Sequence, residues 1–167
     1  MLVATAFFLV VARAGSTGYA PPGSDYAIHT LYIFNFTKHI EWPTGSKQVK
    51  IGVFDNATAE EQLQKMAKAK SNAGAEISVV NTRDENELGT CQIIFIPENS
   101  SAKAAALIQR LGDQPILIVT EESNMVEKGA SISFKIADGK LRFQVNEKTI
   151  RAKGMKVSST LVSLSEK

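Results

Sequence analysis

Four short, almost wholly apolar segments recur through the middle of the chain, and polar or helical stretches separate them. The segments are 49–55, 75–81, 91–97 and 115–121. Strands that helices cover on both faces have this near-continuous apolar character. Because the strands alternate with helical patterns here, the sequence predicts a parallel sheet with helices on its faces. The expected fold class is α/β with three layers, a mainly parallel sheet and flanking helices.

The stretches between these segments carry helix and turn signals. A helix is predicted at about 58–69, and the polar residues 84–90 predict a turn or a short helix. An Ala-rich helix is predicted to end near Leu111. It is expected to begin at Ser100 or Ser101, because serine is a favourable N-cap residue.

The last third of the chain departs from that alternation. Residues 130–146 alternate between apolar and polar with period two on both sides of Asp138-Gly139. This pattern predicts a C-terminal antiparallel hairpin, because both residues tolerate the positive φ of a tight turn. Asn146 is predicted to cap the short helix that follows. Residues 155–167 fit either a strand or a helix.

The N-terminal stretch is interpreted as a processing segment. Residues 2–12 form an apolar run too short for a transmembrane helix, which takes about 20 residues. An Ala-Arg-Ala pattern follows, so cleavage of a signal peptide is expected near Ala14 or Ala20. The alternative is a buried N-terminal strand. The expected organisation is a signal peptide and leader over 1–20 and a single domain over 21–167, exported and without membrane insertion of the mature chain.

Composition and charge leave several protein classes without support. A chain of 167 residues fits one domain. Its formal net charge is +2, and its lysines are mixed with acidic residues rather than grouped. This pattern predicts neither a nucleic-acid partner nor a polybasic membrane patch.

The search for catalytic or metal-binding residues favours a binding or regulatory protein over an enzyme. There is neither a Gly-rich phosphate loop nor a nucleophile elbow. His29 and His39 are ten positions apart, so they do not form the i,i+4 pair that ligates one metal. Cys91 is the single cysteine, which excludes an intramolecular disulfide, and it is expected to be a packed small hydrophobe. Glu121-Glu122 is expected to lie in a solvated loop. No metal and no cofactor are expected.

The helix predicted between Ser24 and Glu41 is apolar over most of its circumference. Ser24 would be its N-cap, and Pro43 helps to end it. Only the sector around Thr30 and Thr37 is polar. A helix of this kind is normally buried on two sides. One side can pack on the sheet, and the other needs a second helix, a second subunit or a ligand.

Five segments, in order, resemble the YfiR-like family. They are "LYIFNFTKHIEWP", "IGVFD", "CQIIFIP", "ILIVTEESNMVEKGASISFKIADGKLRFQVN" and "RAKGMKVSSTLVSL". The resemblance covers about residues 25–164. It implies a periplasmic α/β protein that acts as a regulator. The best-known member binds the periplasmic domain of an inner-membrane diguanylate cyclase and holds it off, which controls cyclic-di-GMP signalling and biofilm formation.

The resemblance also implies a homodimer or larger oligomer, and other members would serve other membrane sensors such as histidine kinases. Family members known for redox control carry several cysteines, whereas this chain carries only Cys91. A disulfide switch within one chain is therefore excluded here.

The predicted partner or dimer interface lies at the end of the apolar helix. Its residues are Tyr32, Phe36, His39, Ile40, Glu41 and Trp42. Tryptophan is enriched among interface hot spots, and an exposed apolar patch without a partner is a liability. A core position beneath the helix end is an equally open interpretation for Trp42. Glu41 could satisfy nearby backbone N–H groups, or pair with Arg142 or Arg151.

The alternative function is that of a small-ligand binding protein. Open parallel sheets bind ligands beyond the carboxyl ends of their strands. The residues that this rule would place around a pocket are Asp55, Asn81, Pro97, Glu98 and Thr120. For Asp55, a helix N-cap or turn residue is the simpler interpretation. Ser158 and Ser159 could line an anion or nucleotide pocket, or form a strand-end turn.

Overall fold

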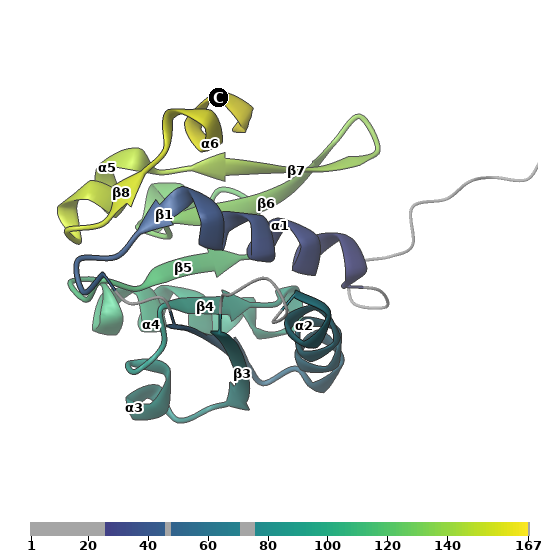
Figure 1. Ribbon diagram of the computed structural model, residues 1–167. Helices are drawn as coiled ribbons and strands as arrows, with labels where there is room; N and C mark the ends of the chain where they lie inside the picture. The colour runs from purple at the N-terminus through teal and green to yellow at the C-terminus, as the bar shows by residue number, and fades with distance from the viewer. Residues whose placement is uncertain (1–25, 46–47, 71–75, 167) are drawn as a thin grey trace, which may run out of the picture.

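Six strands form the central sheet in the computed structural model, which describes residues 26–45, 48–70 and 76–166 (Figure 1). The strands are β2 (Gln48–Phe54), β3 (Glu76–Thr82), β4 (Ile93–Ile96), β5 (Leu117–Thr120), β6 (Ile132–Ala137) and β7 (Lys140–Val145). Their order in the sheet is β3-β2-β4-β5-β6-β7. All neighbouring pairs are parallel except β6 and β7. The predicted α/β class with a mainly parallel sheet and a C-terminal hairpin is confirmed.

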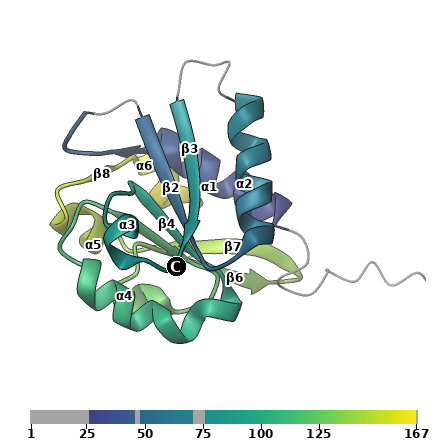
Figure 2. The same cartoon turned by 90° about the horizontal axis from the view of Figure 1, so that it is seen from below.

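Helices cover both faces of the sheet, and α1 and α4 lie on opposite sides of the strands (Figure 2). On one face, a core cluster joins the sheet to α1 (Ala27–His39), α2 (Ala57–Lys70), α5 (Glu147–Ala152) and α6 (Ser159–Leu164). On the other face, a second cluster joins it to α3 (Glu85–Leu88), α4 (Ala104–Leu111) and the 3₁₀ helix η3 (Met125–Lys128). Among the helices of the described ranges, none is both long and apolar enough to cross a membrane.

The burial of the two central strands, β4 and β5, explains the most apolar segments of the sequence. Every residue of β4 and β5 is buried, because helices pack on both of their faces. Cys91 lies just before β4, is 2% exposed and packs in the second core cluster. Burial raises the pKa of its thiol, so Cys91 is the packed small hydrophobe that was predicted.

The C-terminal hairpin also follows its sequence signal. Asp138 and Gly139 both have positive φ, at 51° and 69°. Their turn places Phe134 opposite Phe143 on the face that packs under α1. The side chain of Asn146 accepts a hydrogen bond from the backbone N–H of Thr149, which confirms its role as a helix cap.

The first helix is shorter than predicted at its C-terminal end. It ends at His39, because Ile40–Glu41 forms strand β1, which pairs with β8 (Lys156–Val157). The backbone N–H of Ser158 donates to the His39 carbonyl and continues this pairing. The predicted continuation to Glu41 is therefore wrong. The predicted signal peptide and the predicted Ser24 cap lie outside the described residues.

The second side of α1 is covered largely by α2. The apolar pattern had left open a second helix, a second subunit or a ligand for this side, and the structure has a second helix. Phe34 is buried, and the ammonium groups of Lys38 and Lys70 lie 4.7 and 5.7 Å from its ring centroid. The predicted polar sector is wrong at Thr30, which is buried. Its hydroxyl donates to the Ala27 carbonyl, so the helix itself satisfies the buried group.

The Ala-rich helix begins later than either serine cap predicted. A 3₁₀ helix, η2 (Glu98–Lys103), precedes α4, and the Ser100 hydroxyl donates to the Phe54 carbonyl instead of capping a helix. The C-terminal residues form both a strand and a helix, the two structures that the sequence allowed. Strand β8 is followed by α6, which Ser158 caps by accepting from the Leu161 N–H.

Candidate functional site

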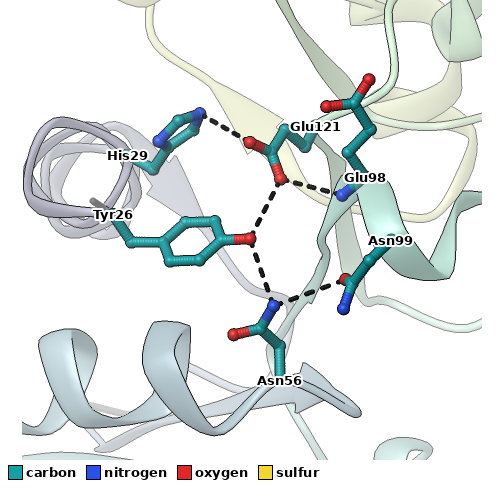
Figure 3. A network of polar contacts seen from close by, with 6 residues as sticks. All are labelled: Tyr26, His29, Asn56, Glu98, Asn99 and Glu121. Atoms are coloured by element: carbon teal, nitrogen blue, oxygen red, sulfur yellow. Dashed lines mark hydrogen bonds and ion pairs between the residues drawn. The ribbon is translucent and has the colours of Figure 1, made fainter. Parts of the chain in front are cut away.

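A connected group of polar side chains lies at the carboxyl edge of the sheet, beside the start of α1 (Figure 3). We call it the polar network. Its members are Tyr26, His29, Asn56, Glu98, Asn99 and Glu121. They come from the beginning of α1 and from the ends of β2, β4 and β5, where parallel strands bring their following loops together.

Glu121 is the centre of the network. Its side chain is 5% exposed, and its Oε2 accepts from the Glu98 backbone N–H at 2.8 Å and from the Tyr26 hydroxyl at 3.4 Å. Its Oε1 lies 3.5 Å from His29 Nε2. Burial raises the pKa of Glu121, and the charge of Glu98 adds to that rise against the two hydrogen bonds. The prediction that Glu121-Glu122 lies in a solvated loop is therefore wrong for Glu121.

Tyr26 links Glu121 to the start of α2. Its hydroxyl accepts from Asn56 Nδ2 at 3.1 Å, and the Asn56 Oδ1 in turn caps α2 by accepting from the Ala59 N–H. Burial and the nearby charge of Glu121 raise the pKa of Tyr26 to about 12. Tyr26 therefore keeps its proton at physiological pH and serves as a donor to the carboxylate.

His29 is held between the network and the aromatic core. It is 3% exposed, and its ring meets Phe134 edge to face with centroids 4.9 Å apart. The rings of Tyr26 and Phe95 lie 5.5 and 6.1 Å away. The helix that carries His29 is thus fixed to the sheet edge by both aromatic packing and polar contacts.

A pocket of about 450 Å³ opens beside the network. Its lining residues are His29, Glu98, Glu121, Glu122, Ser123, Asn124, Lys135, Ile136 and Leu141. Among the residues that the structure describes, no three histidine, cysteine, aspartate or glutamate side chains are grouped so as to hold a metal ion. The residues that line the pocket are acidic, basic and apolar.

The pocket residues predicted from the strand ends are only partly brought together. Asn81 Oδ1 accepts from the backbone N–H of Asn56, and the Thr120 hydroxyl contacts Ser133 Oγ at 3.0 Å inside the protein. Asp55 is a turn residue with φ 53° whose carboxylate pairs with Arg83 at 2.6 Å. These three residues hold the sheet edge together and do not line the pocket.

The other four predicted pocket residues divide in the same way, and Pro97 does not line the pocket. Glu98 lines the pocket. Ser158 and Ser159 lie at the start of α6, where the Ser158 hydroxyl is 2.9 Å from His39 Nδ1. Neither serine lines the pocket beside the polar network.

The residues of the predicted interface fall into two groups. Phe36, Ile40 and Trp42 are 0%, 5% and 9% exposed and belong to the core cluster under α1. The indole N–H of Trp42 donates to the Gln92 carbonyl at 3.2 Å, which favours the core interpretation of this residue. These side chains leave little or no surface for a partner to cover.

The remaining three are nearer the surface. Tyr32 and His39 are half-buried, and the Tyr32 hydroxyl donates to the Leu141 carbonyl. Glu41 is exposed and lies 3.4 Å from Lys156 Nζ. Of the two possibilities for Glu41, pairing with an arginine is wrong: Arg142 lies against Glu166 and Arg151 against Glu147. A role for these residues in an interface stays a prediction.

Two large apolar side chains of α1 point away from the core instead. Ile28 is 53% exposed and Leu31 is 48% exposed, one helical turn apart. We call this pair the exposed face of α1. It lies on the turn of the helix that also carries Tyr26 and His29.

Replacing Tyr26 by phenylalanine is expected to lower the free energy of unfolding by about 1–2 kcal/mol, because the hydroxyl bonds to Asn56 and to a carboxylate. Urea denaturation at neutral pH measures this loss. Tyr32→Phe is the matched control, since its hydroxyl makes one contact, with the Leu141 carbonyl. Equal losses in the two variants would show that the Tyr26 hydroxyl stabilises the fold no more than the single hydrogen bond of Tyr32 does.

Several members of the network were missed by sequence reasoning. His29, Asn56, Asn99 and Glu121 each follow an ordinary helix or strand pattern, and their burial depends on segments far apart in the chain. One signal was available: Asn56 and Glu121 each come shortly after an apolar segment, where parallel strands place functional residues.

Comparisons with known proteins agree with this architecture. A family model described as YfiR/HmsC-like matches residues 26–166. A conserved domain protein from Vibrio cholerae O1 biovar El Tor str. N16961 has a similar structure, with a TM-score of 0.54 and 12% identity. That similarity covers 83% of this chain and 58% of the other, so this chain spans little more than half of its length.

A second similar structure is the ABC domain from Streptococcus pneumonia in complex with L-Trp, with a TM-score of 0.48 and 12% identity. It covers 70% of this chain and 54% of that one. No curated protein sequence matches the chain.

Proposed function

The chain belongs to the YfiR/HmsC-like family, and on that premise we propose that it is a periplasmic regulatory protein and not an enzyme. It binds the periplasmic domain of an inner-membrane diguanylate cyclase and represses its output. A histidine kinase is the second kind of sensor that the same mechanism would serve. The observation that carries the proposal is the family match, which spans residues 26–166.

The mechanism proposed is occupancy of the sensor. A regulator that binds one of two signalling states shifts their equilibrium by its difference in affinity for them. A difference of about 1.4 kcal/mol changes the equilibrium about tenfold, so a modest contact area is sufficient. Release of the regulator then frees the cyclase.

The exposed face of α1 is the surface that we propose docks on the sensor. Ile28 and Leu31 are large apolar side chains that are about half exposed, and a partner that covered them would remove this apolar area from water. Their helix is fixed to the sheet by buried Ile33 and Phe36, so the face is presented rigidly. We further propose that the protein acts as a homodimer, which light scattering of the purified chain tests.

Retention of cyclase activity tests both the function and the surface. The purified chain is immobilised and incubated with detergent-solubilised inner membranes, and the bound fraction is assayed for conversion of GTP to cyclic-di-GMP and for histidine autophosphorylation. We expect the unaltered chain to retain this activity. The double variant Ile28→Asp, Leu31→Asp is expected to retain at least about tenfold less, because two carboxylates would have to be desolvated in the contact.

The matched control places aspartates on the opposite side of the sheet. Ala105→Asp, Ala106→Asp changes two exposed positions of α4, and it should retain as much activity as the unaltered chain. Circular dichroism verifies that both double variants are folded. If the unaltered chain retains neither cyclase nor kinase activity, the proposed function is wrong. If both double variants bind equally well, the function stands and the docking surface lies elsewhere.

A further inference from the structure

We propose that two copies of the chain pair along strand β3 and join their central sheets into one continuous sheet. The two β3 strands would run antiparallel about a two-fold axis, with Val79 of one copy opposite Val79 of the other. The inference rests on the proposed homodimer and gives it an interface. It uses neither the exposed face of α1 nor the polar network, so it does not depend on which sensor the protein binds.

Strand β3 is an edge strand of the sheet, and α2 lies beside it (Figure 2). All seven of its residues pair in register with β2. Its sequence, EISVVNT, has neither proline nor lysine, the residues with which edge strands commonly prevent pairing. Within the described ranges, no further strand and no backbone hydrogen bond from a loop covers its outer side. A long, regular edge of this kind is a template for another strand.

The opposite edge of the sheet is partly covered by the chain itself. There the backbone N–H of Glu166 donates to the Phe143 carbonyl of β7 at 2.9 Å. The Glu166 carboxylate also lies 3.7 Å from Lys135 and 3.8 Å from Arg142 of the hairpin. Among the described residues, β3 is therefore the edge that is open to a second chain.

The contacts of α2 identify which of its flanks faces this open edge. The row that faces the sheet is buried and consists of Ala59, Leu63 and Ala67. On the flank towards α1, the Lys70 ammonium group lies 5.7 Å from the centroid of the Phe34 ring. Met66, four positions earlier, lies on that flank too. The row on the other flank, away from α1 and towards the β3 edge, is Glu60, Gln64 and Lys68.

This outer row of α2 has opposite charges at its ends, with Glu60 in the first turn and Lys68 in the last. The helix has 14 residues and β3 has 7, so each is about 20 Å long. The backbone N–H of Asn56 donates to the Asn81 side chain, which sets the start of α2 level with the end of β3. A two-fold axis at Val79 therefore passes near the middle of α2, and sets Glu60 of each copy towards Lys68 of the other.

The β3 edge is apolar on the face that α2 covers. Ile77 and Val79 pack against the core cluster there, and both are only half-buried. In the proposed register, Val79 meets Val79 and lies diagonal to Ile77 of the second copy. Pairing would remove this surface from water. An unrelated extended peptide would offer backbone hydrogen bonds alone, whereas a second copy also supplies the complementary charge row.

Sedimentation equilibrium of the purified chain and of charge-reversed variants tests the pairing. At neutral pH and about 50 mM salt, where surface charges are weakly screened, we expect the unaltered chain to dimerise. Glu60→Lys and Lys68→Glu each replace attraction by repulsion twice in the dimer, and should weaken dimerisation at least about tenfold. An equimolar mixture of the two variants should regain the lost affinity, because each copy then meets the opposite charge in the other.

Lys65→Glu is the matched control. Lys65 is exposed on the same helix and pairs with Glu61 outside the outer row, so this variant should dimerise like the unaltered chain. Circular dichroism verifies that all variants are folded. A chain that stays monomeric would overturn both the homodimer and this interface. A dimer that the variants weaken no more than the control does, or that mixing does not restore, would keep the homodimer and overturn the β3 interface.

Discussion

Replacing Phe36 by alanine is expected to lower the free energy of unfolding by about 3–5 kcal/mol, which is a large part of the stability of a domain of this size. Phe36 is 0% exposed. Its ring packs against Phe143 and Phe134, with centroids 5.2 and 6.1 Å apart. Truncation would leave a cavity between α1 and the hairpin that its neighbours fill only in part. Urea denaturation measures the loss.

Leu31→Ala is the control on the same helix. Leu31 is 48% exposed, and alanine is at least as good a helix former, so we expect a change within about 0.5 kcal/mol. If Phe36→Ala costs no more than this control, Phe36 does not belong to the core, and its predicted role in an interface regains support. With the expected outcome, Phe36→Ala is unsuitable for mapping a partner, because loss of binding would report loss of structure.

The second large effect is a dependence of stability on pH that Lys153 causes. Lys153 is 7% exposed, and its Nζ donates to the Ile116 carbonyl at 3.1 Å. Burial lowers the pKa of its amino group to about 8, against the opposing effect of Asp113. An unfolded chain would hold this proton with a pKa of about 10.4. Burial of the charged form therefore costs stability below pH 8.

The sign of the effect follows from which state holds the proton. Between pH 8 and about 10.4 the unfolded chain keeps the Lys153 proton while the folded protein loses it, so Lys153 makes the free energy of unfolding rise with pH. We expect this contribution to rise by about 2 kcal/mol between pH 7 and about 9.5. The raised pKa of the Cys91 thiol acts in the opposite direction.

Lys153→Met isolates the contribution of the lysine. Methionine has a similar unbranched shape and no charge, and Cys91 is present in both proteins, so its effect cancels in the difference. The free energy of unfolding of the wild type, measured relative to the variant in urea at each pH, should rise by about 2 kcal/mol over that window. A difference that stays constant with pH would mean that the Lys153 amino group is solvated in the folded protein.

Much of the fold could be predicted because its signals are local. The apolar runs of β4 and β5, the period-two alternation around Asp138 and the cap at Asn146 each need only a few neighbouring residues. The errors lie at element ends. The pairing of Ile40 with Val157 ended α1 early, and that pairing joins residues far apart in the sequence.

The candidate site was predicted less well, and for the same reason. The strand-end rule indicated the correct edge of the sheet, and Glu98 lies in the pocket there. The rule did not distinguish Glu121, which is buried, from an ordinary loop carboxylate. Its carboxylate accepts a hydrogen bond from Tyr26, which is 95 positions away in the sequence.

The sequence by itself determined the α/β class, the hairpin and the resemblance to a family of periplasmic regulators, because periodicity, turn chemistry and motif order are properties of short segments. Only the tertiary structure decided which apolar residues of α1 are core and which are surface. A helix that is apolar on most sides has no single face marked by its sequence. Packing against the sheet and α2 buries Ile33, Phe36 and Phe34, whereas Ile28 and Leu31 stay exposed. That outcome depends on where distant segments meet, since burial is a property of the packed chain.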